Sequence, residues 1–520
     1  MKNIIIGSGI CGINVLQTHV ENFDAQLEVW SSGNLDDFEN HSSRENFFNE
    51  KSDFNSSSKL LFGDNFENLN LEINEIFKIP GKIKLLETNS EFLNDNIKLI
   101  SSRLFGGLGN KWGANCLPYN IHDIHDWNID KNKFIDEIYQ VSSRFMINRV
   151  EDDLNHKFDI KTFGSENNFS LDPRDNLLIQ NYKKKIDQSK NFAIGNSRLA
   201  IRNNHDEKCL ECCKCIWGCP ANLIYNPKLE FKNILEKEKE KISYRENINI
   251  DHFIIKGKKI TEIIYEKNKK LFSEKIKGKV FLSAGAINSF KIIVKTLIKN
   301  NFDIKKFDFG FMDTQTTKIV YILPSLIGNK FEKNVIQYNR LIAGLLYKNS
   351  LKNYIHLEIL NLTSLNYTPI VNTLPFSMKF SKELFYKLLP SLGAVTIFNP
   401  DKLYNNKTIN IKGLYNYEIN YHLSNEDKNM KLWAQKEISK KLLKLGAIPL
   451  KVINFKTGSG IHYAGTMPMG KKNSVTDNKG KTIFAENLFI ADSSIYPNLP
   501  SKPISMNAAA LGSYVVKNAR

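Results

Sequence analysis

The stretch KNIIIGSGICG at residues 2–12 is followed by INVLQTHVE at 13–21 and by QLEVW at 26–30. The apolar run that opens the first stretch predicts a short buried strand. The spacing of apolar residues in the second stretch predicts a helix, and the third stretch predicts another strand. The N-terminus therefore predicts a β-strand, α-helix, β-strand unit.

The turn between the first strand and the helix contains Gly7, Gly9 and Gly12 in GxGxxG spacing. The first glycine permits a tight turn, the second lets backbone N–H groups approach a pyrophosphate, and the third lets helix and strand pack closely. This pattern predicts a dinucleotide at the helix N-terminus. The acidic residue that usually ends the second strand is missing, so we expect Ser31 or a later Asp or Asn to hold the ribose, since Glu28 lies inside the strand.

Four further segments extend the pattern. Residues 103–116 form a glycine-dense loop with one tryptophan, which is suited to close approach to a flat ligand. Residues 279–297 predict a strand, a small-residue turn and a helix, and residues 486–516 predict the same order with a longer loop. Between them, residues 316–455 carry alternating strand-like runs and a long amphipathic helix at about 425–445. This middle region is interpreted as a second domain.

The chain has 520 residues, a net charge of +17 and a sequence pI of about 9.2. Its length predicts two joined domains. The charge is compatible with an anionic substrate such as a nucleotide sugar or sugar phosphate, with contact at an anionic membrane surface, or with a solvated basic surface alone. No nucleic-acid-binding pattern is present. The chain has no 18-residue apolar window and no signal-peptide pattern, so we expect a cytoplasmic protein. Residues 32–70 are rich in Asn, Ser, Asp and Phe, and we expect them to form a long surface excursion.

Five of the seven cysteines lie between residues 209 and 219. Cys209, Cys212, Cys215 and Cys219 precede Pro220 in the spacing C-x2-C-x2-C-x3-C-P, which is that of a ferredoxin run. This spacing predicts a [4Fe–4S] cluster. In two-cluster ferredoxins the fourth cysteine of such a run binds the other cluster, and this sequence has no second run. A zinc site, metal-free thiols and a disulfide therefore stay open as alternatives.

These motifs, taken in order, resemble the glucose-methanol-choline (GMC) family of flavoprotein oxidoreductases. GSGICG, GGLGNKWGAN, HDWNIDKNKFIDEIYQ, VFLSAGAINS, YEINYHLSNEDKNM, IHYAGT and AENLFIADSSIYP follow one another as in that family. The resemblance implies an α/β fold (α+β overall), with a discontinuous Rossmann-like FAD-binding domain and an inserted antiparallel-sheet substrate domain. The expected boundaries are 1–315 and 456–520 for the FAD-binding domain, with a Cys-rich segment at 205–222, and 316–455 for the substrate domain.

The same resemblance implies residues that contact FAD. Beyond the N-terminal glycines and Ser31, they are Gly106, Gly107, Asn110, Trp112, Gly113, Ala284, Gly285, Asp492 and Pro503. Some family members attach FAD through a histidine before the tryptophan of the flavin loop. Lys111 stands in that place, so we expect non-covalent FAD.

The resemblance also implies a catalytic pair. His462 matches the family's active-site histidine, and imidazole, with a pKa near 6.5, suits a base that accepts a hydroxyl proton. The family's second group, usually His or Asn before a proline, is replaced by Lys502 before Pro503. A lysine there could stabilise an alkoxide or flavin anion, or bind an anionic substrate. The alternatives are altered or lost alcohol chemistry, or an exposed loop lysine.

The sequence therefore predicts an FAD-dependent dehydrogenase that oxidises an alcohol, with a sugar or sugar derivative as the substrate. An iron–sulfur cluster would pass electrons singly to a protein or quinone acceptor. A non-catalytic or electron-transfer flavoprotein is the alternative, and peripheral membrane contact is a further one.

Overall fold

The computed structural model describes residues 2–36, 87–94, 97, 99–110, 112–165, 169–186, 188–203, 207–209, 219, 221–329, 339–362, 375–404 and 406–519. The predictions for Lys111, Cys212 and Cys215, and for most of the segment 32–70, fall outside these residues.

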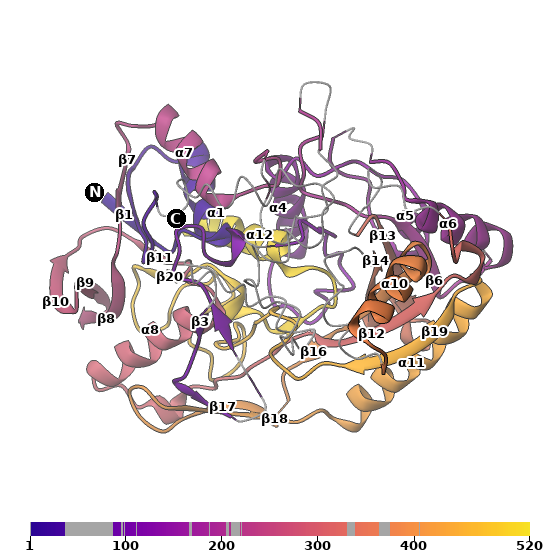
Figure 1. Cartoon of the computed structure of the whole chain (residues 1–520). Helices are drawn as coiled ribbons and strands as arrows, with labels where there is room; N and C mark the ends of the chain where they lie inside the picture. The colour runs from indigo at the N-terminus through magenta and orange to yellow at the C-terminus, as the bar shows by residue number, and fades with distance from the viewer. Residues whose placement is uncertain are drawn as a thin grey trace.

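A five-stranded parallel sheet has the order β20-β11-β1-β2-β7. Its strands are β1 (Lys2–Ile6), β2 (Gln26–Trp30), β7 (Ile242–Arg245), β11 (Val280–Leu282) and β20 (Leu488–Ile490). They come from both ends of the chain and from its middle, and the two termini lie on this side of the molecule (Figure 1). The predicted discontinuous Rossmann-like fold is confirmed.

Two helices from opposite ends of the chain hold this sheet together. α1 (Ile10–Asn22) packs against α12 (Ile504–Asn518). Asn14 of α1 donates to the Ala509 carbonyl at 2.7 Å and to Ser513 Oγ at 2.6 Å. Arg144, at the end of α4 (Lys131–Arg144), donates to Asn14 Oδ1 at 2.7 Å. Because all these groups are paired, their burial is compensated, and they fix the closing segment on the opening one.

A six-stranded antiparallel sheet has the order β19-β12-β15-β14-β13-β6 and lies beside the parallel sheet (Figure 1). Its strands are β6 (Phe192–Asn196), β12 (Gln315–Ile322), β13 (Leu341–Leu346), β14 (Tyr354–Asn361), β15 (Leu392–Asn399) and β19 (Ile448–Asn454). β6 joins this sheet from a segment expected in the FAD-binding part, so the exact domain boundaries stay a prediction.

The two faces of this sheet have different partners. α11 (Asn425–Lys444) packs along one face, where Gln435 donates to Thr317 Oγ1 at 3.2 Å. The next side chains along β12, Thr316 and Lys318, line a cavity on the other face. This is the alternation expected of a strand. Thr316 and Lys318, two even-numbered residues of β12, therefore face the cavity.

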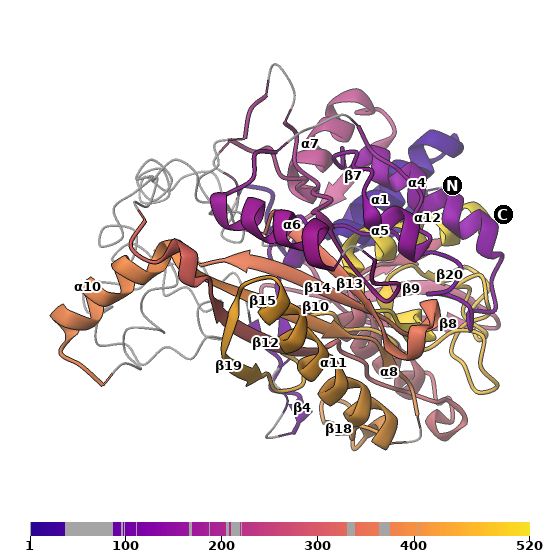
Figure 2. The ribbon, with the colours of Figure 1, turned by 90° about the vertical axis from the view of Figure 1, so that its right-hand side faces the viewer.

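Smaller elements complete the described part. Three small sheets have the orders β10-β9-β8, β17-β18-β4 and β3-β5, and β16 pairs with β21. Their strands are β3 (Glu87–Thr88), β4 (Phe92–Leu93), β5 (Ile100–Ser101), β8 (Asn249–Lys256), β9 (Lys259–Lys267), β10 (Lys270–Lys275), β16 (Asp401–Lys402), β17 (Lys407–Ile411), β18 (Tyr417–Tyr421) and β21 (Asn498–Leu499). The other helices are α5 (Asp153–Phe158), α6 (Pro173–Lys185), α7 (Pro227–Lys237), α8 (Ala286–Lys299) and α10 (Met378–Leu388). α10 extends away from the parallel sheet (Figure 2). Among the described helices, none has the length and apolar character needed to cross a membrane.

Candidate active site

A cavity of about 710 Å³ lies between the parallel sheet and the six-stranded sheet. Its lining includes residues 6–11, 100–104, 107–109, 112–113, 283–288, 459–463 and 503–505, together with side chains from β12, β14 and β15. Ligands of parallel α/β sheets bind at the carboxyl ends of the strands. β1 and β11 both end at this cavity, which is therefore the expected dinucleotide site.

The glycine turn after β1 leaves room only toward the cavity. A Cβ on Gly12 would lie 1.8 Å from the Gly7 carbonyl oxygen, and Gly7 has a φ of +111° with the Ser283 carbonyl 2.3 Å from its own Cβ position. A Cβ on Gly9 would meet no protein atom closer than 3.8 Å. Gly7 and Gly12 are thus required by the fold, whereas Gly9 leaves space for a ligand.

This difference predicts two distinct outcomes for glycine variants. Gly9→Ala should fold but bind FAD about tenfold more weakly or worse, because the methyl group projects into the cavity. Gly12→Ala should lower the yield of folded protein, because its methyl group clashes with backbone. FAD titration of the apoprotein and thermal unfolding measure the two effects separately. Full FAD affinity in Gly9→Ala would place the dinucleotide elsewhere.

Three helix N-termini at the cavity lack a side-chain cap. Among the described α-helices, α4, α5, α6, α7, α10 and α11 each have a side chain that accepts from a first-turn N–H group. α1, α8 and α12 begin after Gly9, Gly285 and Pro503 without such a bond, and all three starts line the cavity. Unpaired N–H groups and the helix dipole favour negative charge. The cavity is therefore built for an anionic ligand.

Several predicted FAD residues hold the loops rather than line the cavity. Ser31 is 2% exposed, and its hydroxyl lies 2.7 Å from Ser8 Oγ and accepts from Gly33 N at 3.2 Å. Asn110 donates to the Phe105 carbonyl at 2.6 Å. The predicted residues Gly107, Trp112 and Gly113 do line the cavity, and so do Trp30 and Ser32, which were not among the predicted FAD residues.

Asp492 has a similar positioning place at the start of α8. It is fully buried, and its Oδ2 accepts from Gly285 N at 2.9 Å and from Ser289 Oγ at 2.5 Å. Its Oδ1 accepts from Ser494 N at 2.9 Å. Asp492 therefore fixes the turn that carries Ala284 and Gly285, two cavity residues, instead of reaching into the cavity itself.

The imidazole of His462 lies in the cavity with one nitrogen engaged. Nδ1 is 3.1 Å from Thr314 Oγ1, and the ring stacks on Phe398 with centroids 5.5 Å apart. Nε2 makes no hydrogen bond among the described residues. If Nδ1–H donates to Thr314, the Nε2 lone pair is available. Burial lowers the pKa of His462 to about 4, so the ring is neutral at pH 7.

The loop before His462 is fastened by a buried carboxylate. Asp313 accepts from the backbone N–H groups of Gly458 at 2.8 Å, Gly460 at 3.1 Å and His462 at 3.1 Å. Ile461 has a φ of +56°, an uncommon conformation for a branched residue. The three bonds to Asp313 offset the cost of that conformation and fix the direction of the imidazole.

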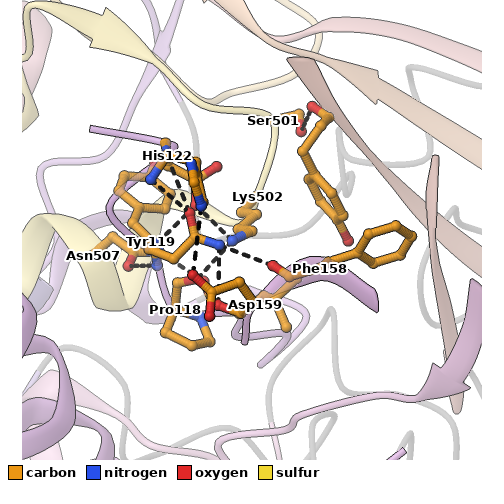
Figure 3. Close-up of polar contacts among 12 residues, drawn as sticks. Pro118, Tyr119, His122, Phe158, Asp159, Ser501, Lys502 and Asn507 are labelled. Carbon is orange, nitrogen blue, oxygen red and sulfur yellow. Dashed lines mark hydrogen bonds and ion pairs between the residues drawn. The ribbon is translucent and has the colours of Figure 1, made fainter. Parts of the chain in front are cut away.

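Lys502 points away from the cavity. It is 1% exposed, and its ammonium donates to the Pro118 carbonyl at 3.0 Å and to Asp123 Oδ2 at 2.5 Å (Figure 3). The Asp123 carboxylate also accepts from Asn120 N at 2.8 Å. This placement differs from the expectation that Lys502 faces the substrate or flavin. The lysine joins the closing segment to residues 118–123, while its neighbour Pro503 lines the cavity.

Only two cysteines of the ferredoxin-like run fall within the described residues. Cys219 Sγ accepts from Leu223 N at 3.3 Å, and Arg340 Nη2 lies 3.9 Å from Cys209 Sγ. Within the described part of the chain there is no group of three or more Cys, His, Asp or Glu residues placed to hold a metal. Cys116 is a buried free thiol, and burial raises its pKa.

The sequence motifs did not indicate the residues that surround His462. Asp313, Thr314 and Phe398 hold the imidazole, and Lys318 and Glu358 line the cavity. The sequence pattern around Lys318 and Glu358 could have indicated these two residues. In TTKIVYI and YIHLEIL, a polar residue stands among apolar ones at strand spacing, which places it on one face of a buried strand.

Residues 421–512 match a family model described as GMC oxidoreductase. Pyridoxine 4-oxidase from Mesorbium loti has a similar structure, with a TM-score of 0.64 at 12% identity over 99% of this chain and 98% of that one. A formate oxidase matches with a TM-score of 0.64 at 12% identity over 99% and 97%. A variant of the Aspergillus oryzae RIB40 formate oxidase gives the same values. No curated protein matches the sequence.

The fold, the cavity and the family match together assign an FAD-dependent oxidoreductase acting on CH–OH groups. Its C-terminal segment, which carries His462 and Lys502, matches the GMC oxidoreductase model. The structural likenesses, at 12% identity, show the shared fold.

Proposed function

We propose that the chain oxidises an alcohol to a carbonyl compound with FAD in the cavity and His462 as the base. The observation that carries this proposal is the imidazole itself. It lies in the cavity with Nδ1 beside Thr314 and with Nε2 free of hydrogen bonds among the described residues. A candidate base needs an available lone pair within reach of the substrate proton, and this arrangement supplies it.

The residues present fit FAD. The open space at Gly9 and the uncapped start of α1 would hold the pyrophosphate. Gly107, Trp112 and Gly113 would hold the flavin, as the GMC resemblance implies, and the start of α12 adds N–H groups for its negative charge. When bound, FAD supplies the acceptor for the hydride that leaves the carbinol carbon.

His462 would accept the hydroxyl proton of the alcohol, which does not leave with the hydride. The alcohol loses two electrons and two protons in all. One proton leaves with the hydride, and the hydroxyl proton passes to Nε2 as the C=O bond forms. Thr314 fixes the ring, and Asp313 fixes the backbone that carries it. Burial keeps the imidazole neutral before reaction and ready to release the proton afterwards.

An electron path through the Cys-rich segment is a second proposal, supported by the ferredoxin-like spacing and by one contact. Cys209 lies next to Arg340, and the adjoining Asn339 lines the cavity. A cluster at this segment would lie near the alcohol site and favour a protein or quinone acceptor. Pyridoxine 4-oxidase and formate oxidase carry the name oxidase, so oxygen is the competing acceptor. The test is to measure iron and labile sulfide in anaerobically purified protein. Their presence would support a cluster, and their absence would leave zinc or metal-free thiols.

The experiment that tests the proposed function uses the purified holoenzyme. We expect about one FAD per chain. It should be released unmodified by denaturation, and its visible absorbance should bleach under anaerobic conditions when sugars, sugar acids and simple alcohols are added in turn. Protein that holds FAD and is bleached by dithionite, but by none of these alcohols, would favour an electron-transfer flavoprotein.

A further inference from the structure

A row of polar side chains crosses the cavity face of the six-stranded sheet. Lys318 on β12 pairs with Thr396 on β15, and Glu358 on β14 pairs with the same threonine. All three side chains line the cavity. Directly opposed residues on neighbouring strands share a face, so the row presents an ammonium, a hydroxyl and a carboxylate side by side.

The two charges in this row are not bonded to each other. Lys318 has no carboxylate within 4.0 Å and no hydrogen bond among the described residues, and its nearest aromatic contact is the Phe455 ring at 5.8 Å. Glu358 Oε1 accepts from Asn115 Nδ2 at 2.8 Å, whereas its Oε2 has no hydrogen bond in the described part. Burial lowers the pKa of Lys318 and raises that of Glu358. Partly desolvated charges of this kind gain most from a ligand that supplies the missing partner.

Two neighbouring polar atoms also lack partners. Asn115 Oδ1 and Thr396 Oγ1 are buried without a hydrogen bond, and both residues line the cavity. Buried polar atoms in proteins are normally paired. Four unsatisfied groups therefore gather on one wall of a cavity whose other features serve a dinucleotide.

The row lies a short distance from the proposed base. Phe398, which stacks on His462, pairs with Thr316 on β12. Lys318 is two residues further along the same strand, or about 7 Å at the usual rise per residue. His462 and Lys318 line the same cavity, so one alcohol could place its reacting carbon beside His462 and its other end at Lys318.

We propose that the substrate is an alcohol with one acidic group, a carboxylate or a phosphate, which is bound by Lys318. Glu358 faces a hydrogen-bond donor of the same molecule, such as a second hydroxyl group, and disfavours a second acidic group there. A hydroxy acid or a sugar phosphate meets both requirements. This inference rests on the proposed function for the reacting hydroxyl, but the binding of the acidic group can be measured without any turnover.

The binding test uses the holoenzyme and inert probes. Sodium benzoate should perturb the flavin spectrum with a dissociation constant at least about tenfold lower than that of benzamide. Lys318→Met should remove this difference, and Lys318→Arg should retain most of it. Lys451→Met is the matched control, because Lys451 is an exposed lysine on the adjoining strand β19. Equal binding of benzoate and benzamide by the unaltered protein would overturn the inference.

The turnover test compares alcohols that differ only in charge. We expect para-(hydroxymethyl)benzoate or para-(hydroxymethyl)phenyl phosphate to exceed benzyl alcohol in kcat/KM by about tenfold or more, and the better of the two identifies the acidic group. Lys318→Met should raise KM for the acidic alcohol and remove most of its advantage over benzyl alcohol, whereas Lys451→Met should leave the kinetics of both alcohols nearly unchanged. Turnover of neutral and acidic alcohols at equal efficiency would refute the inference alone. Failure of every alcohol would refute the proposed function, and benzoate binding would still decide the role of Lys318.

Discussion

Replacement of His462 by alanine is expected to slow bleaching of the flavin by the alcohol by about 10²- to 10⁴-fold, the usual contribution of a positioned base. The reason is that His462 is the only described histidine that lines the cavity, and its Nε2 makes no hydrogen bond among the described residues. Lys502 is bound to Asp123 and Pro118, and His356, which is fully buried, does not line the cavity. Stopped-flow absorbance of the anaerobic holoenzyme measures the effect.

FAD content is the internal control for this variant. The FAD contacts expected at the glycine turn and at the starts of α1 and α8 lie on other segments, so His462→Ala should retain FAD at the level of the unaltered protein. His422→Ala, which removes an exposed histidine just after β18, should react at the unaltered rate. A His462→Ala variant that holds FAD and reacts within a few-fold of the unaltered protein would contradict the role of His462.

The second large effect is on stability. Lys502→Met should lower the free energy of unfolding by about 3–5 kcal/mol, because it leaves the Asp123 carboxylate buried with a single described donor, Asn120 N. The double variant Lys502→Met, Asp123→Asn should recover much of that loss, since no unpaired charge is left. Denaturant midpoints at saturating FAD compare the three proteins.

The same variant separates a structural lysine from a catalytic one. If Lys502 only fastens the closing segment to residues 118–123, FAD-loaded Lys502→Met should bleach with the alcohol at a rate close to that of the unaltered protein. A rate lower by about a hundredfold in a variant of normal stability would place the ammonium at the substrate. That outcome would restore the role expected from the position of Lys502 before Pro503.

Local patterns in the sequence predicted the elements that local physics determines. The glycine motif predicted a strand, helix and strand, and β1, α1 and β2 lie where it placed them. The helix expected at about 425–445 is α11. These elements depend on apolar spacing and on conformations available to glycine, which are properties of neighbouring residues.

The direction of particular side chains could not be predicted in the same way. Lys502 and Asp123 are 379 positions apart, and no local pattern indicates that they form a buried pair. Ser31 was expected at the ribose, but its hydroxyl bonds to Ser8 and Gly33. The cavity wall formed by Lys318, Thr396 and Glu358 depends on the register of three strands, which is set by tertiary pairing.

The proposed reaction requires a carbinol carbon to give up its hydride in this cavity. The most direct test compares the anaerobic bleaching of the holoenzyme's flavin by an alcohol with that by the same alcohol carrying deuterium on the carbinol carbon. Bleaching should be several-fold slower with deuterium, because that C–H bond breaks in the step that is observed. Bleaching at the same rate with both, or by neither while FAD is fully bound, would contradict it.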